Sequence, residues 1–230
     1  MLEKTLQTTK GTLRIKIPSR LNEVTLGQMI ELQENSNLND LQAISILSGA
    51  PVAELKDVRN FDDLSVFADC IFSLSDQIRY LYNSDVVPKK MTFAVDKRNV
   101  NVKVPSNLAI EPAGAFMAAR EIIADEIKEH VLQYGEDGLK QGFNPSLKSC
   151  CQVLAHYFFC RVTGQKYNEY EAEEFCYTIK KLRVTEALPI AKHFFTCYPS
   201  LSTPKTSCFH QFQLYWKKKL GFTPSRNLNI

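Results

Sequence analysis

Two segments of the chain repeat one another in register, and this repeat constrains the fold more than any other feature of the sequence. The segment LRIKIPSRLNEVTLGQMIELQE begins at Leu13, and VNVKVPSNLAIEPAGAFMAARE begins at Val100. Aligned without gaps, they are identical at Lys16/Lys103, Pro18/Pro105, Ser19/Ser106, Leu21/Leu108, Gly27/Gly114 and Glu34/Glu121. Apolar positions match around these identities, so the pattern favours an internal duplication.

The first copy has the pattern of a strand, a turn and a helix. Residues 13–17 alternate between apolar and polar side chains, which predicts a half-buried strand. Pro18 cannot donate to a β-ladder and therefore ends that strand. Thr25 and Gln28 have the spacing of a capping box, with an apolar stripe behind them. We therefore expect a helix to begin at this point.

The second copy predicts the same order of elements with an extra strand before it. Residues 91–95 and 100–104 read as two strands joined by a tight hairpin loop. Pro112 suits a helix start. The Gly-rich stretch 134–144 is expected to be a loop.

Further helices are predicted downstream in each copy. Gly49 and Gly164 follow apolar-periodic segments and are well placed as left-handed C-caps. A long helix in the first copy is expected from the stripe Phe61, Leu64, Phe67, Ile71, Leu74, Ile78 and Leu81. Two more are expected around Phe175, Ile179 and Leu182 and around Leu188, Ala191, Phe195 and Tyr198.

The predicted fold class is α+β and mainly helical, with internally duplicated strand–turn–helix units around a small antiparallel sheet. Three regions are expected. Residues 1–87 form a first half of strands and helices, and residues 88–200 form a second, expanded half. Residues 201–230 form a basic amphipathic helix followed by an irregular tail.

Composition and cysteine usage indicate a globular intracellular protein. Hydrophobic residues make up 44% of the chain and charged residues 23%, which is ordinary for a folded domain. No apolar run is long enough to span a bilayer, and the first residues lack the pattern of a secretion signal. The seven cysteines are odd in number and contain no Cys-x-x-Cys pair, so we expect free, mostly buried thiols.

Catalytic motifs are missing from the sequence. It contains no Gly-x-Ser-x-Gly elbow, no P-loop and no Gly-x-Gly-x-x-Gly after a strand. The vicinal pair Cys150 and Cys151 lies on an apolar helical stripe, where burial would raise the thiol pKa and make the pair unreactive. We therefore expect a protein that is not an enzyme and needs no cofactor.

Two His-x-x-x-Cys spacings, His156/Cys160 and His193/Cys197, resemble metal-ligand pairs. Residues four apart share a helix face, so two such helices would be able to complete a tetrahedral zinc site. The neighbouring residues are mostly aromatic, which favours core packing and no metal site.

An acidic cluster admits a similar pair of interpretations. Carboxylates close together can hold metal ions, and the cluster consists of Glu169, Glu171, Glu173 and Glu174. No histidines accompany them at matching spacing, and acidic residues are favoured in the first turn of a helix. A solvated helix start is the preferred interpretation.

The C-terminal segment is the candidate partner-binding region. Residues 201–230 contain no Asp or Glu, and their basic residues are Lys205, Lys217, Lys218, Lys219 and Arg226. Phe209, Phe212 and Trp216 fall on one helical stripe beside this charge. We expect the aromatic face to dock on a partner, with the lysines beside an acidic surface or packaged nucleic acid.

The segment IPSRLNEVTLGQMIELQE resembles the opening of a group of proteins from tailed bacteriophages, represented in crAss-like gut phages and their relatives. In that group a strand leads into Pro-Ser-x-Leu and then into a Glu-Val-Thr-Leu-Gly-Gln helix start. The helix ending in Ser-Ile-Leu-Ser-Gly is also similar. The resemblance extends over residues 13–200 and is strongest over residues 13–60. The second copy departs from it at Glu111-Pro112-Ala113, where Thr-Leu is expected.

The resemblance implies a protein of the virion structural module, located in the virion and in the host cytoplasm during assembly. It would be internal cargo, a portal- or tail-associated component, or a tail assembly chaperone. Its partners would be other phage structural proteins. A different hypothesis is a cytoplasmic regulatory or nucleic-acid-binding protein that uses the basic C-terminal segment.

Overall fold

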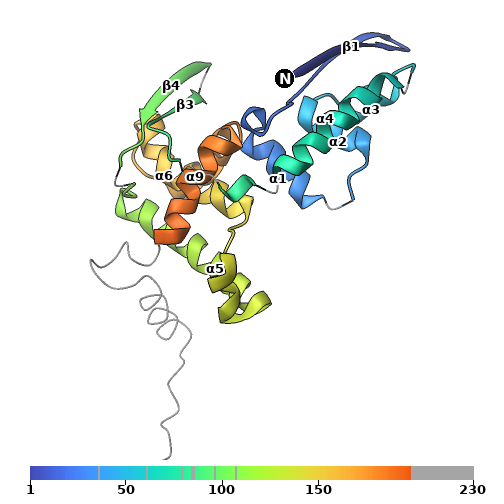
Figure 1. Ribbon diagram of the computed structural model, residues 1–230. Helices are drawn as coiled ribbons and strands as arrows, with labels where there is room; N and C mark the ends of the chain where they lie inside the picture. The colour runs from blue at the N-terminus through green and yellow to red at the C-terminus, as the bar shows by residue number, and fades with distance from the viewer. Residues whose placement is uncertain are drawn as a thin grey trace, which may run out of the picture.

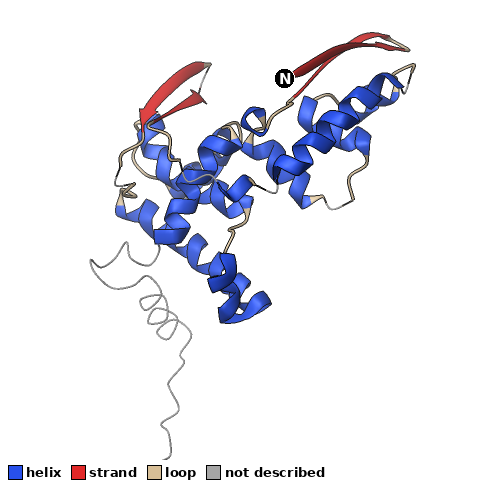
Figure 2. Cartoon of the chain, in the orientation of Figure 1, coloured by secondary structure: helices blue, strands red, loops and turns tan. Residues whose placement is uncertain are grey.

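The computed structural model describes residues 1–197 except 36, 61, 79, 84–85, 96 and 107, and it describes only the backbone of residues 136–142. The fold is mainly helical α+β, and the described residues form two two-stranded antiparallel sheets that lie apart from one another (Figures 1 and 2). Within the described residues, no helix is long and apolar enough to cross a lipid bilayer.

The first sheet is a hairpin of β1 (Leu2–Thr8) and β2 (Gly11–Ile17). The two strands pair from Leu2 opposite Ile17 to Thr8 opposite Gly11. The prediction of a strand over residues 13–17 is confirmed. The preceding strand was not predicted, although its Leu6 is buried in the core.

Four helices and two short 3₁₀ helices follow in the first half. They are η1 (Leu21–Glu23), α1 (Leu26–Glu34), α2 (Asp40–Ser48), α3 (Val52–Lys56), α4 (Asp62–Ile78) and η2 (Leu81–Asn83). The predicted capping box is present, because the backbone N–H of Gln28 donates to Thr25 Oγ1 at 3.2 Å and that of Thr25 donates to Gln28 Oε1 at 2.9 Å. Gly49 ends α2 with φ 75°, as predicted.

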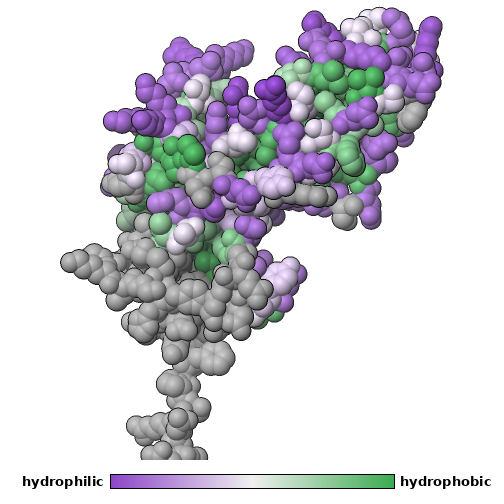
Figure 3. Space-filling view, in the orientation of Figure 1, coloured by the Kyte–Doolittle hydropathy of each residue, from purple (hydrophilic) through white to green (hydrophobic). Residues whose placement is uncertain are grey.

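The second sheet is a hairpin of β3 (Lys90–Val95) and β4 (Arg98–Lys103), which confirms the predicted hairpin. Its outer edge is hydrophilic, and apolar residues appear beneath it (Figure 3). No ladder in the described residues joins β3–β4 to β1–β2. Each half therefore has a small sheet of its own.

The helices in the described part of the second half are α5 (Ala113–Gly142), α6 (Leu147–Thr163), α7 (Glu169–Glu174), α8 (Cys176–Ile179) and α9 (Val184–Cys197). The prediction of a loop over residues 134–144 is wrong, because α5 continues to Gly142. Gly135, with φ 72° and ψ 175°, is a non-helical kink, and helical structure resumes after it as a second segment. The good helix formers Leu, Lys and Gln that follow this glycine outweigh the other glycines of the stretch.

Helix α6 forms the centre of the hydrophobic core. It packs on α5, α7, α8 and α9, and Phe158 on α6 contacts Phe93 of β3 with ring centroids 4.8 Å apart. Gly164 ends α6 with φ 69°, as predicted. The core is continuous with that of the first half, because α1 packs against both α6 and α9.

Backbone hydrogen bonds connect the start of α1 to the segment between α8 and α9, and we call this connection the joint. The N–H groups of Leu26 and Gly27 donate to the carbonyls of Leu182 and Lys180, both at 2.8 Å. The N–H of Val184 donates in return to the carbonyl of Val24 at 2.9 Å. These bonds occupy amides of the first turn of α1, which have no partner within the helix.

Candidate interaction surface

The residues predicted to bind a partner are Phe209, Phe212, Trp216, Lys217, Lys218 and Lys219, and they lie outside the described residues. The described part of the chain offers a candidate contact surface of a different kind. It is the outer face of α4, which carries exposed apolar side chains next to acidic ones.

The two faces of α4 differ in burial. Leu64, Phe67 and Leu74 point into the core, as the apolar stripe predicted. On the remaining surface, Phe72 is 73% exposed and Val66 is 42% exposed. Single exposed apolar residues are common, but a large aromatic side chain beside a hollow is a frequent anchor for a protein partner.

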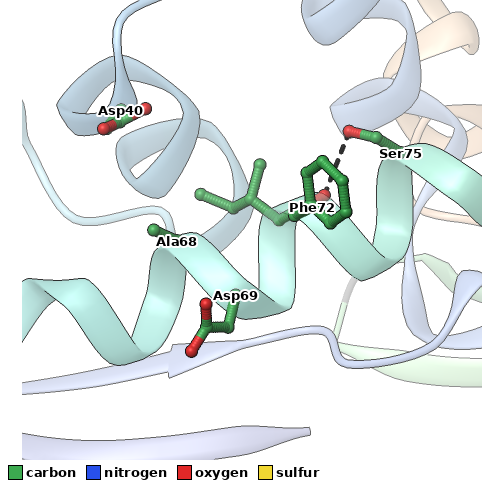
Figure 4. A pocket seen from close by; sticks show the side chains of 6 residues that line it. Asp40, Ala68, Asp69, Phe72 and Ser75 are labelled. Carbon is green, nitrogen blue, oxygen red and sulfur yellow. Dashed lines mark hydrogen bonds between the residues drawn. The ribbon is translucent and has the colours of Figure 1, made fainter.

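A shallow hollow of about 390 Å³ lies between α4 and the start of α2 (Figure 4). We call it the α4 hollow, and its lining residues are Asp40, Ala68, Asp69, Ile71, Phe72 and Ser75. Asp40 comes from α2 and the others come from α4. The Ser75 hydroxyl donates to the Ile71 carbonyl at 3.1 Å, so this hydroxyl is directed along the helix.

The surface around the α4 hollow is acidic. The sequence of α4 contains Asp62, Asp63, Asp69 and Asp76 and no Lys or Arg. Asp63 pairs with Lys4 at 2.9 Å, whereas Asp40 and Asp69 have no ion-pair partner among the described residues. An apolar centre between unpaired carboxylates is suited to a ligand that combines aromatic and cationic groups.

Contacts at both ends hold α4 in place. Near its start, Lys4 Nζ of β1 donates to the carbonyl of Asp63 at 3.0 Å as well as to its carboxylate. Near its end, Gln77 Oε1 accepts from the Leu21 N–H at 3.0 Å. The α4 hollow is therefore built on a helix that the hairpin and η1 support, which favours a preformed surface.

The two His/Cys pairs do not form a shared site. His156 is buried, and its Nδ1 lies 2.9 Å from the Tyr167 hydroxyl. His193 Nδ1 lies 3.7 Å from Cys197 Sγ within α9. Nowhere in the described residues are three His, Cys, Asp or Glu side chains placed to hold one metal ion.

We expect His156 to make stability depend on pH. Burial lowers its pKa below the usual 6.5, although Glu169 and Glu173 oppose the shift. As the pH falls below about 6.5, His156 takes up a proton in the unfolded chain but stays neutral in the folded chain. The free energy of unfolding should therefore fall with the pH in this range. Urea unfolding from pH 7.5 to 5 should show this fall.

The matched variants are His156→Gln, which keeps a hydrogen-bonding group without the titration, and His193→Gln. Burial also lowers the pKa of His193, which is the less buried of the two. His156→Gln should reduce the pH dependence more than His193→Gln does. If the free energy of unfolding depended on pH equally in wild type and in His156→Gln, this assignment would be contradicted.

The acidic cluster forms a helix start, as interpreted from the sequence. Asn168 caps α7 by accepting from the Glu171 N–H at 3.4 Å, and Glu169 and Glu171 lie in the first turn with exposed side chains. Carboxylates in that position stabilise the helix dipole.

The vicinal cysteines are buried on α6. Burial, aided by the nearby Glu126 carboxylate, raises the pKa of Cys150, which keeps its thiol protonated. The cysteines in the described residues are Cys70, Cys150, Cys151, Cys160, Cys176 and Cys197, and no disulfide joins any two of them.

No protein-family model, no curated protein and no solved structure matches the chain. Its function is therefore inferred from its own residues.

Proposed function

We propose that the chain is a non-enzymatic virion or virion-morphogenesis protein of a tailed phage that acts by protein–protein contact. It would serve as internal cargo or as a portal- or tail-associated component. The observation that carries the proposal is the exposed Phe72 beside the acid-lined α4 hollow, a surface suited to binding a protein segment. The resemblance over residues 13–60 supplies the phage assignment.

The residues that carry the resemblance have a defined structural place. Leu26 and Val24 are buried, and the amides at the start of α1 form the joint to residues 180–184. Thr25 and Gln28 cap the helix. The pattern that carries the resemblance is therefore engaged in packing and hydrogen bonding within the fold.

We infer in addition that the two halves arose by duplication. Each has an antiparallel hairpin, a proline shortly after it and then a helix with glycine in its first turn. Burial agrees in register, because Ile17 and Val104 are buried whereas Lys16 and Lys103 are exposed. Both repeat glycines also lie at close contacts, since a Cβ would come within 3.0 Å of Lys180 at Gly27 and within 2.9 Å of Tyr167 at Gly114.

The virion assignment is tested by quantitative mass spectrometry of purified phage particles. We expect a fixed number of copies of the chain per particle. Absence from mature particles, with binding to phage structural proteins in infected cells, would instead indicate a tail assembly chaperone. Absence from particles together with binding to nucleic acid would favour the regulatory hypothesis.

The C-terminal segment should contribute to incorporation. Trp216→Ala should lower the number of copies per particle more than Lys218→Ala does, because buried aromatic side chains dominate interface energies and rim charges mainly tune association. Deletion of residues 205–230 should lower it further. Phage carrying each variant can be purified and compared by mass spectrometry, and unchanged incorporation of the deletion variant would contradict a contact role for the segment.

A further inference from the structure

We propose that the α4 hollow binds the basic C-terminal segment of a second copy of this chain, so that copies join head to tail. The inference rests on the proposed function, because it names the partner for a protein that acts by protein contact. The hollow is the acceptor, and residues 205–220 are the donor.

The chemistry of donor and acceptor is complementary. The hollow combines the exposed Phe72 with Asp40 and Asp69, neither of which has an ion-pair partner among the described residues. The donor has Trp216 followed by Lys217, Lys218 and Lys219, and no acidic residue occurs from position 201 to the end of the sequence. The aromatic side chain would fill the hollow while the lysines meet the carboxylates at its rim.

The position of α9 favours a donor segment from a second copy over the donor segment of the same chain. The first residue of α9, Val184, is hydrogen-bonded to Val24 at the joint with the first half. Its last residue, Cys197, ends a helix of 14 residues that is about 20 Å long at 1.5 Å per residue. In Figure 1 this C-terminal end of α9 and helix α4 lie on opposite sides of the molecule. The described part of the chain therefore ends on the side away from the hollow.

The proposed contact joins two different surfaces, so a single contact leaves one binding surface open on each copy. Each copy that donates its segment keeps an open hollow, and its acceptor keeps an open segment. Contacts of this kind produce rings or open chains of copies. Assembly by repeated addition is consistent with a component that lines or fills a phage particle.

Complementary mixing of two variants of the full chain tests the proposal. Asp69→Lys/Phe72→Ser removes the acceptor through exposed side chains and leaves the donor intact. Trp216→Ala weakens the donor and leaves the acceptor intact. The control is Glu171→Lys/Tyr170→Ser on α7, which makes the same kinds of change on another acidic surface, where Tyr170 is 80% exposed.

Sedimentation velocity over a range of protein and salt concentrations gives the readout. Wild type and the α7 control should form species heavier than the 26.2 kDa chain at low salt, and added salt should weaken them. Each of the other two variants should associate at least about tenfold more weakly on its own. Their equimolar mixture should form a species of two chains and nothing larger, because only one functional donor and one functional acceptor are present.

Three results would overturn the inference. One is a wild type that stays monomeric at low salt, and another is an acceptor variant that associates as the wild type does. The third is a mixture that remains monomeric although wild type associates. Circular dichroism of each variant verifies that it folds. Incorporation of the same variants into particles is measured separately, so undiminished incorporation without self-association would refute the head-to-tail contact and leave the virion role standing.

Discussion

Replacement of Phe158 by alanine should lower the free energy of unfolding by about 3–5 kcal/mol, the range for large aromatic residues removed from a core. Phe158 is fully buried on α6, and its ring lies 4.8 Å from that of Phe93 and 4.6 Å from that of Tyr157. The loss combines apolar transfer energy with a cavity between α6 and the β3–β4 hairpin. Urea unfolding followed by circular dichroism measures it.

The matched control is Tyr177→Ala on α8, because Tyr177 is an aromatic residue that is 77% exposed. It should change the free energy of unfolding by no more than about 0.5 kcal/mol. A loss below about 1 kcal/mol for Phe158→Ala would show that the hairpin does not pack on α6 as the structure places it.

The Gly27→Ala variant should be destabilised by about 1–3 kcal/mol, the usual range for overpacking. A Cβ at this position would lie 3.0 Å from Lys180 Cβ and 3.1 Å from the Lys180 carbonyl oxygen. That oxygen accepts the Gly27 N–H at 2.8 Å, so it cannot move away without weakening the joint. Helix propensity alone predicts the opposite sign, a gain of about 1 kcal/mol.

Urea unfolding of Gly27→Ala therefore tests both the sign and the size of the change in the free energy of unfolding. Gly114→Ala is the companion variant, in which the contact is the Tyr167 ring, 2.9 Å from the added Cβ. A side chain can move aside more easily than a backbone atom, so Gly114→Ala should lower the free energy of unfolding by less than Gly27→Ala does. Stabilisation of Gly27→Ala would mean that α1 and residues 180–184 are less tightly joined than described.

Local signals made much of the fold predictable. Thr25 with Gln28, Gly49 and Gly164 mark helix ends by hydrogen-bonding groups or backbone conformations that few other residues supply. The β3–β4 hairpin followed from alternating residues on both sides of a short loop. In these cases a few neighbouring residues determine the structure.

Elements that depend on distant contacts were harder to predict. The strand β1 contains Glu3, Lys4, Thr5 and Gln7 and is stabilised by pairing with β2, which the sequence of β1 alone does not reveal. The prediction of a loop after Tyr134 was wrong because helical structure resumes directly after the kink at Gly135.

The candidate surface could be predicted only in part. The apolar stripe of α4 located its buried face correctly, but Phe72 lies off that stripe, so the stripe does not indicate its exposure. The α4 hollow depends on the start of α2 lying beside α4, and the spacing of Asp40 and Asp69 in the sequence gives no sign of this proximity. The predicted donor residues lie outside the described residues, so their role stays a prediction.

The joint between Val24 and Val184 has a consequence for how the chain folds during synthesis. The hydrogen bond between them spans roughly 160 residues of sequence, and contacts of such separation form late and slow folding. The ribosome therefore releases β2 and α1 long before residues 180–184, which bond to the start of α1, have been synthesised. Until then Val24 and Leu26, both buried in the finished molecule, stay open to water or to other chains. A nascent chain truncated before residue 180 should therefore be prone to aggregation.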